Sequence, residues 1–317
     1  MTTAHHKKRL PLTVIGGFLG AGKTTLLNRW LREANGLRMA VLVNDFGALN
    51  IDAELIAATH GDTTALTNGC VCCQIGDDLG RALVGVIEAS PPFDAVVIEA
   101  SGVSDPWRIA QIGMAAPELS LEGVIVLVDA SAVAQQALDP LLADTLVRQL
   151  KSADLVVVNK ADLASAEALA AATDWVEATA PGTPCIETRN AAVPLALLSG
   201  LPHAEQAPHA CGPGCHADHG HDAPDHGAMF QTWSAKPEAV IPAATLRAWL
   251  RQMPPGVLRL KGLLRTGDGE WSELQFAGRH GSLRKAAPPA DDARAGVVAI
   301  GLRGRLPEGA LREFFAR

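Results

Sequence analysis

The sequence predicts an α/β fold: a mostly parallel sheet followed by a small α+β domain. Short apolar, β-branched segments alternate with amphipathic helical patterns from residue 10 to about residue 198. Such alternation is typical of a parallel sheet with helices on both faces. Residues 201–227 change to His, Gly, Pro, Ala and Asp without periodicity, which indicates a linker. We therefore expect a nucleotide-binding domain at 1–200, a flexible linker at 201–227 and an α+β domain at 228–317.

The elements follow from this pattern in chain order. In the first domain we expect strands at Leu12–Ile15, Met39–Val43, Ala95–Ile98, Val124–Val128 and Leu155–Val158, and helices at Thr24–Ala34, Asp77–Glu88, Pro140–Lys151 and Ser165–Thr179. In the second domain we expect a strand from Met229, a helix at Ala243–Arg251, strands at Val257–Leu264, Glu270–Phe276 and Gly296–Leu302, and a helix at Glu308–Phe315.

A complete phosphate-binding loop joins the first strand to the first helix. Its residues are Gly17-Phe18-Leu19-Gly20-Ala21-Gly22-Lys23-Thr24, and Thr25 follows. A glycine-rich turn there directs consecutive backbone N–H groups and the helix N-terminus at one anion. Lys23 would reach the β- and γ-phosphates, and the Thr24 hydroxyl would hold Mg²⁺. The alternative, a glycine-rich turn matching by chance, does not explain the flanking strand and helix.

The choice of base is indicated by Asn159-Lys160-Ala161-Asp162 after an apolar strand. The Asp162 carboxylate can accept hydrogen bonds from both N1–H and the exocyclic amine of guanine. Adenine lacks these donors and would leave the carboxylate unsatisfied. Lys160 can lie over the base, and Asn159 can brace the loop. The sequence therefore favours GTP over ATP.

The bulk properties fit a cytoplasmic enzyme. A chain of 317 residues can bury a large core, and its formal net charge of −7 argues against nucleic acid as a main partner. The basic start at His5–Arg9 imitates an export signal, but the phosphate loop accounts for the apolar stretch that follows. No apolar segment approaches the ~20 residues that span a bilayer, so we expect no membrane association.

Three thiols form a second chemical centre in Asn68-Gly69-Cys70-Val71-Cys72-Cys73. Gly69 permits a turn that would bring Cys70, Cys72 and Cys73 to one soft metal ion. Three thiolates leave a tetrahedral Zn²⁺ one ligand short, and the fourth could be a His, a water or a side chain of a recipient protein. Such an incomplete shell suits transfer. Buried structural cysteines, a redox couple and a cluster are the alternatives. Cys185 is expected to be structural.

The linker is a third centre. It contains six of the ten histidines, at positions 203, 209, 216, 219, 221 and 226, together with two cysteines. Spaced imidazoles can gather Zn²⁺, Co²⁺ or Ni²⁺ more weakly than a thiolate site. The candidate weak ligands are His209, Cys211, Cys215, His216, His219 and His221. The alternative is a merely polar linker.

Five motifs occur together in the order and rough spacing of one family: Gly17–Thr24, Asn44-Asp45-Phe46-Gly47, Cys70–Cys73, Glu99-Ala100-Ser101-Gly102 and Asn159–Asp162. The chain thus resembles the CobW-type GTPases, which include zinc-regulated GTPase metalloprotein activators. These are metallochaperone-like relatives of the nickel-insertion GTPases for urease and hydrogenase. The resemblance covers the first domain densely and continues through the His-rich linker into what looks like the family's C-terminal domain.

The resemblance implies roles for further residues. Asp45 would sit in the first switch, Glu99 would lie near Mg²⁺ or its water, and the Gly102 amide would face the γ-phosphate. With Lys23, these are the expected catalytic residues. Two positions depart from the family pattern, which more often has Glu at Asp45 and Thr or Ser at Ala100. The first change shortens a potential ligand by one methylene.

These expectations combine into a mechanism. A GTP-hydrolysing metallochaperone would bind Zn²⁺, with Co²⁺ as a further candidate, and deliver it to a client metalloprotein under control of the GTP/GDP switch. A dedicated cobalt or iron insertion factor, as in a cobalamin pathway or for a nitrile hydratase, is the second hypothesis. A His-rich metal buffer is the third. Dimerisation across the nucleotide face is a further expectation, carried over from related nucleotide-switch GTPases.

Overall fold

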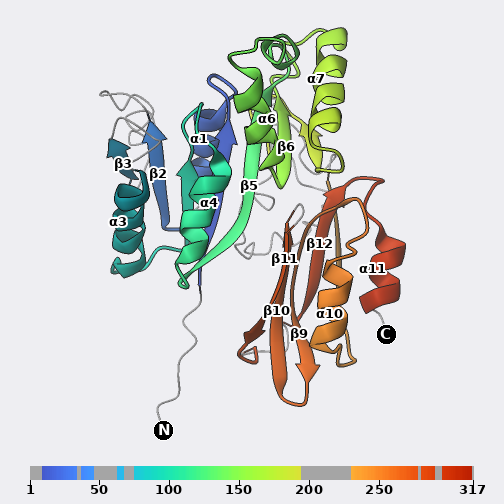
Figure 1. Ribbon diagram of the computed structural model, residues 1–317. Coiled ribbons are helices and arrows are strands. Elements are labelled where there is room, and N and C mark those ends of the chain that lie inside the picture. Colours follow the sequence, from blue (N-terminus) through green and yellow to red (C-terminus); the bar gives the residue numbers. More distant parts are fainter. Residues whose placement is uncertain are drawn as a thin grey trace, which may run out of the picture.

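A computed structural model describes residues 9–33, 37–45, 63–67, 75–193, 230–277, 280–289 and 295–315. These residues form two sheets with their helices, one sheet built from residues 10–187 and one from residues 230–302 (Figure 1).

The first sheet has seven strands in the order β3-β2-β4-β1-β5-β6-β7, and all of its strand pairs are parallel. The strands are β1 (Leu10–Gly17), β2 (Met39–Asp45), β3 (Thr63–Thr67), β4 (Ala95–Glu99), β5 (Leu119–Asp129), β6 (Leu155–Asn159) and β7 (Cys185–Glu187). The side chains of β4 and β6 are buried along their whole length, which is why these strands are continuous apolar segments in the sequence. The expected parallel sheet is confirmed.

Helices cover both faces of this sheet. They are α1 (Lys23–Glu33), α3 (Ile75–Glu88), α4 (Pro106–Ala115), α5 (Val133–Gln136), α6 (Ala143–Lys151) and α7 (Ala166–Thr179). One apolar core joins the sheet to α3 through α7, and the other joins it to α1 and to residues of the second sheet. Within the described part of the chain, no helix is long and apolar enough to cross a membrane.

Some elements differ from those expected from the sequence. The helix expected to begin at Pro140 begins at Ala143, because the Asp139 carboxylate accepts the N–H of Leu141 at 2.9 Å and forms a turn before it. Helix α4 was not expected, although it has a clear start signal. Asp105 caps it by accepting the Trp107 N–H at 2.9 Å, and Pro106 occupies the first helical position. Strands β3 and β7 and helix α5 were also missed, because each is only three to five residues long.

The second sheet is antiparallel, with five strands in the order β11-β10-β9-β12-β8. Its elements are β8 (Phe230–Ala235), α10 (Ala243–Leu250), β9 (Val257–Gly267), β10 (Glu270–Ala277), β11 (His280–Ala286), β12 (Gly296–Leu302) and α11 (Glu308–Phe315). The two helices pack together through aromatic rings, with Trp249 stacked on Phe314 at 4.6 Å between ring centroids. The expected α+β character is confirmed, and β11 is an addition.

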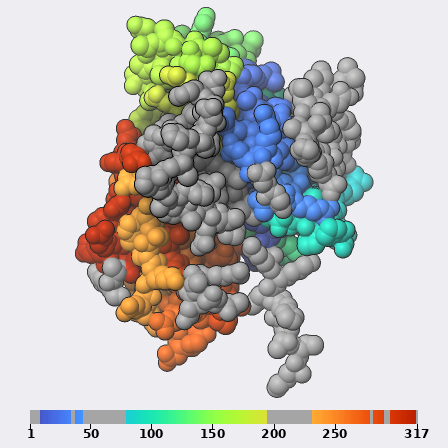
Figure 2. Space-filling view, turned by 180° about the vertical axis from the view of Figure 1, so that it is seen from behind, coloured from blue at the N-terminus to red at the C-terminus, as the bar shows by residue number. Residues whose placement is uncertain are grey.

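The two sheets meet in a seam that is partly apolar and partly charged. Leu258 of β9 joins the apolar core beneath α1. The Glu122 carboxylate of β5 contacts the Arg259 guanidinium and lies 3.2 Å from the Lys261 ammonium, both on β9. Burial lowers the pKa of Arg259, and the attraction of Glu122 opposes that shift. The view from behind shows the two parts lying against each other (Figure 2).

Candidate nucleotide site

The carboxyl ends of four neighbouring strands meet at one edge of the parallel sheet. Gly17 ends β1, Glu99 ends β4, Asp129 ends β5 and Asn159 ends β6. In the strand registers, Ile15 lies opposite Glu99 and Asp129 lies opposite Asn159. Ligands bind at this edge in open α/β sheets, where the chain changes direction between the two halves of the sheet.

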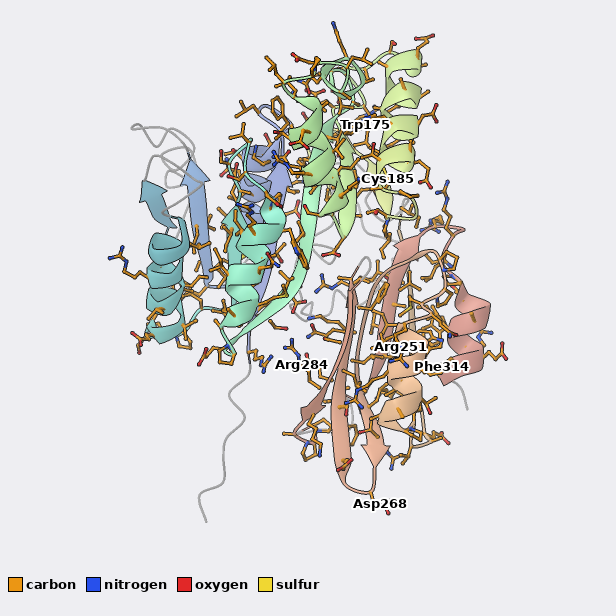
Figure 3. The ribbon with its side chains drawn as sticks, in the orientation of Figure 1. Trp175, Cys185, Arg251, Asp268, Arg284 and Phe314 are labelled. Atoms are coloured by element: carbon orange, nitrogen blue, oxygen red, sulfur yellow. The ribbon has the colours of Figure 1, made fainter. Side chains whose placement is uncertain are left out.

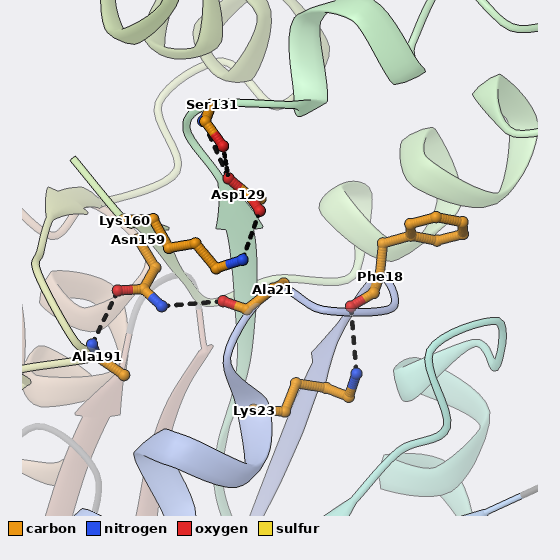
Figure 4. A network of polar contacts seen from close by, with 8 residues as sticks. All are labelled: Phe18, Ala21, Lys23, Asp129, Ser131, Asn159, Lys160 and Ala191. Atoms are coloured by element: carbon orange, nitrogen blue, oxygen red, sulfur yellow. Dashed lines mark hydrogen bonds and ion pairs between the residues drawn. The ribbon is translucent and has the colours of Figure 1, made fainter. Parts of the chain in front are cut away.

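The phosphate loop turns tightly above the end of β1 (Figure 4). The Ala21 N–H donates to the Phe18 carbonyl at 3.2 Å, which closes the turn. The Lys23 ammonium donates to the same carbonyl, also at 3.2 Å, and its side chain is largely buried. The first-turn position of Lys23 on α1 thus brings its charge over the loop that would surround the phosphates.

Two glycines of the loop are required by geometry. Gly22 has φ +103°, and a Cβ there would lie 2.4 Å from the Asn159 amide nitrogen. Gly17 has φ +131°, and a Cβ there would lie 2.4 Å from the carbonyl oxygen of Leu127 on β5. Any side chain would push the loop away from β5 and β6, so packing alone requires glycine at both positions.

A candidate Mg²⁺ site lies beside the loop. The Thr24 hydroxyl donates to the Glu99 carboxylate at 3.1 Å, and Glu99 is only 3% exposed. A hydroxyl and a buried carboxylate are oxygen donors of the kind that Mg²⁺ prefers, directly or through its water molecules. The residues present therefore fit a Mg²⁺ ion.

Asn159 connects the end of β6 to the phosphate loop. Its amide nitrogen donates to the Ala21 carbonyl at 2.9 Å, and its amide oxygen accepts the Ala191 N–H at 2.8 Å (Figure 4). The Thr188 hydroxyl donates to the same oxygen at 3.2 Å. Because Asn159 is fully buried, these bonds hold three separate segments in one arrangement.

Lys160 and Asp162 follow at the rim. Lys160 has φ +62°, and its ammonium lies 2.7 Å from the Asp129 carboxylate at the end of β5. Partial burial raises the pKa of Asp129, but hydrogen bonds from Lys160 and Ser131 outweigh this and leave that pKa below its ordinary value. Asp129 therefore stays ionised and holds Lys160 in place. The Asp162 side chain is exposed, where a base could reach it.

Two family models match this chain. Residues 11–187 match the model described as CobW/HypB/UreG, nucleotide-binding domain. Residues 230–317 match the model described as cobalamin synthesis protein cobW C-terminal domain. The first match alone covers more than half of the chain. The chain belongs to the CobW/HypB/UreG family.

Curated relatives of this CobW/HypB/UreG protein carry names that refer to zinc. The chain is 35% identical over 231 residues to the zinc chaperone CobW of a Sinorhizobium species, covering 63% of this chain and 65% of the relative. It is 35% identical over 244 residues to the zinc chaperone CobW of Pseudomonas aeruginosa, covering 67% and 64%. It is 34% identical over 170 residues to the zinc-regulated GTPase metalloprotein activator 1 of Schizosaccharomyces pombe, covering 50% and 41%. The matches thus span less than two thirds of each relative.

Several predicted site residues of this CobW/HypB/UreG chain lie outside the described residues. These are Cys70, Cys72, Cys73 and the linker ligands between 209 and 221, and the side chain of Asp45 at the end of β2 is likewise not described. Within the described ranges, no three His, Cys, Asp or Glu side chains form a metal-binding group. Burial raises the pKa of Cys185 to about 12, with Glu187 and Glu177 adding to the effect, so its thiol stays protonated and is a poor ligand.

Two residues that support the site, Asp129 and Gln149, were not predicted from the sequence. Asp129 could have been found as a carboxylate directly after an apolar strand, like Glu99. Gln149 could have been found as a polar residue on the buried face of α6, between Leu146 and Leu150. Its amide nitrogen donates to the Gly102 carbonyl at 3.0 Å and to the Ser104 carbonyl at 2.9 Å. Gln149 thus fixes the segment whose Gly102 amide is predicted to face the γ-phosphate.

Replacing Gln149 by leucine is expected to lower the free energy of unfolding by about 1–3 kcal/mol, because two buried carbonyls lose their donor. GTP affinity should fall more than GDP affinity, since only GTP has the γ-phosphate that Gly102 would contact. Urea unfolding and nucleotide titration measure the two effects. The control is Gln135→Leu, at an exposed position of α5. An equal loss of GTP and GDP affinity would contradict a role in sensing the γ-phosphate.

Proposed function

We propose that this chain is a cytoplasmic, GTP-hydrolysing metallochaperone that binds Zn²⁺ at Cys70, Cys72 and Cys73 and delivers it to a client protein under control of the GTP/GDP switch. One observation chiefly supports the proposal. The strand that leads to the three cysteines ends at the same edge of the sheet as the phosphate loop and the base-reading segment.

The register of β3 explains why this observation supports the proposal. Strand β3 runs parallel to β2, and Thr67 at its end pairs with Asp45 at the end of β2. Cys70 follows Thr67 by three residues, and three residues of extended chain span at most about 11 Å. A metal site there would be close to the predicted first switch, and helix α3 begins immediately after the cysteine segment, at Ile75. The segment therefore follows β3, a strand of the parallel sheet, and precedes α3, a helix that packs on that sheet.

GTP hydrolysis would use groups that the phosphate loop and β4 provide. The Gly17–Thr25 backbone and the Lys23 ammonium would hold the β- and γ-phosphates. Thr24 and Glu99 would hold Mg²⁺, whose charge offsets that of the phosphate oxygens. The Gly102 amide would donate to the γ-phosphate. Asp45 would contribute from the first switch. The sequence places no glutamine within either predicted switch, Asn44–Gly47 or Glu99–Gly102, so we expect slow intrinsic hydrolysis that metal or client binding accelerates.

Guanine would be selected by Asp162, with the other two residues of the motif positioning it. Asn159 braces the phosphate loop through Ala21, and Lys160 is oriented by Asp129. Base and phosphate recognition are thereby linked through direct hydrogen bonds, which supports one nucleotide site made from both motifs.

Metal binding and nucleotide binding would be coupled through the switches. GTP·Mg²⁺ would order Asp45 and Gly102, and so hold the three thiolates in a binding arrangement until hydrolysis releases them. His209, Cys211, Cys215, His216, His219 and His221 would add weak sites that load or store metal. Coupling in binding is reciprocal, so Zn²⁺ should also strengthen GTP binding. We further propose that two copies associate across the nucleotide face.

The proposal is tested by measuring Zn²⁺ affinity in apo, GDP-bound and non-hydrolysable GTP analogue-bound protein. We expect Zn²⁺ to bind at least roughly tenfold tighter with the analogue than with GDP, within the range of about 5–150-fold that is typical of coupled sites. Cys72→Ser should remove both the tight site and the nucleotide effect, because a serine hydroxyl stays protonated at neutral pH. Cys185→Ser is the matched control and should change neither.

The same titrations separate the alternatives. Equal Zn²⁺ affinity in all three states would contradict the switch, because a ligand without preference between states shifts no equilibrium. Tight binding that survives Cys72→Ser would favour a buffer based on the linker. A stronger nucleotide effect for Co²⁺ or Fe²⁺ than for Zn²⁺ would favour a dedicated insertion factor.

A further inference from the structure

A cavity of about 290 Å³ lies between the two sheets. It is next to the start of β5, whereas the candidate nucleotide site is at the other end of that strand. Its walls come from both parts of the chain, namely β5 and α4 on one side and β9, β10 and β11 on the other. Its volume is close to the lower end of the range for small-molecule sites.

The side chains that line the cavity carry more positive than negative charge. Four cationic side chains line it against two carboxylates: Arg9, Arg259, Lys261 and Arg284 against Glu122 and Asp154. Glu122 is engaged by Arg259 and Lys261. The Asp154 carboxylate accepts the Val124 N–H at 2.8 Å and is turned toward the β5 backbone. The positive excess contrasts with the net charge of −7 of the whole chain.

Arg284 and Arg9 account for that excess. Arg284 extends from β11 toward the first sheet (Figure 3), where its guanidinium donates to the Ser120 hydroxyl at 3.2 Å. Among the described residues, neither arginine has a carboxylate within ion-pair distance. Partial burial lowers the pKa of Arg284 and repulsion from Arg9 lowers it further, while attraction from its cross-strand neighbour Glu273 and from Glu122 raises it. Two neighbouring guanidiniums that repel each other would be stabilised by an anion between them.

Most of the rest of the wall is apolar, and Gln275 and Ser282 are its polar members. Trp107 and Met114 of α4 face the cavity from one side, and Phe276 of β10 lines it from the other. An aromatic and aliphatic wall next to a cationic group is the arrangement that holds an amphipathic anion, with its apolar part shielded from water.

We propose that this cavity binds a small organic anion, with a carboxylate or phosphate group at Arg284 and Arg9 and an apolar body against Trp107, Met114 and Phe276. A ligand there contacts both sheets at once, so its binding stabilises the seam between them. This site is separate from the nucleotide site and does not depend on the proposed metal delivery.

The test uses the full chain with excess GDP, so that anion binding at the phosphate loop does not contribute. The probes are anilinonaphthalene sulfonate and its uncharged parent, phenylnaphthylamine, followed by their own fluorescence and by that of Trp107 and the other tryptophans. We expect the sulfonate to bind at least roughly tenfold tighter than the uncharged probe, because charge-assisted hydrogen bonds hold it. Phenylacetate and phenyl phosphate then compete with the sulfonate, and the stronger competitor identifies the head group.

Arg284→Gln should abolish the preference for the sulfonate while leaving the affinity for the uncharged probe unaffected, since the variant removes the positive charge and keeps the apolar wall. Arg9→Gln is a second variant, at an exposed position where the change should not disturb packing between the two sheets. It should lower the affinity for the sulfonate in the same way. Arg312→Gln on α11 is the charge-matched control. Equal affinity for both probes in the wild type, or an unchanged preference in Arg284→Gln and Arg9→Gln, would overturn the proposal. An equal loss of the preference for the sulfonate in Arg312→Gln would also overturn it.

Discussion

Lys23→Ala is expected to lower the rate of GTP hydrolysis by at least ~100-fold, the effect of removing one preorganised charge-stabilising donor. The physical reason is that negative charge builds up on the β/γ oxygens as the phosphoryl group transfers, and the ammonium at the start of α1 would be its main protein cation. Single-turnover phosphate release with saturating GTP and Mg²⁺ measures the effect on the chemical step.

The variant also loses the hydrogen bond from Lys23 to the Phe18 carbonyl, so its folding has to be checked. Unfolding curves for Lys23→Ala and the wild type should agree to within about 1 kcal/mol, since one hydrogen bond is worth about that much. Lys151→Ala, at an exposed position of α6, is the control with the same change in charge. Hydrolysis at the wild-type rate in a folded Lys23→Ala protein would place the catalytic centre elsewhere.

Asp162→Asn is expected to weaken GTP binding by roughly 100-fold or more and to improve the binding of xanthosine triphosphate. The carboxylate would accept two hydrogen bonds from guanine, and each bond to a charged group is worth about 1.5–3 kcal/mol. Xanthine has a carbonyl in place of the amine, and the asparagine amide can donate to it. Competition between the two triphosphates for one fluorescent guanine nucleotide measures the change.

Asp174→Asn on α7 is the matched control, because it removes one exposed carboxylate that lies outside the motif, twelve residues after Asp162. It should leave the preference for GTP intact. If Asp162→Asn retained that preference to the same degree as the control, Asp162 would not read the base, and the choice of GTP over ATP would need another explanation.

The sequence predicts those parts of the site that depend on neighbours in the chain. The phosphate loop, Glu99 and Asn159 all follow strands whose apolar residues are contiguous, so their place at the carboxyl edge of the sheet follows from the pattern alone. The first residue of a helix was harder to predict where a hydrogen bond from a side chain determines it. Asp139, for example, delays the start of α6 by making a turn.

Contacts between distant segments could not be predicted in this way. Gln149 reaches Gly102 across 47 positions, and Arg259 reaches Glu122 across 137. Each is a polar residue that is buried within its element, and its partner is decided by how helices and sheets pack. The sequence marks such residues as unusual for their position, but it does not name what they bind.

Strand β5 carries a carboxylate that forms an ion pair near each of its two ends. Glu122 near its start is held by the second sheet, and Asp129 at its end orients Lys160. Seven residues of extended chain separate them, about 23 Å at ~3.3 Å per residue. Beyond a register shift at Glu122, β5 pairs with β1 along residues 123–127 and with β6 along residues 125–129. The seam with the second sheet and the contact between Asp129 and Lys160 are therefore the two ends of one continuous strand, so a load on the C-terminal part would be carried toward the proposed nucleotide site without any contact with the nucleotide.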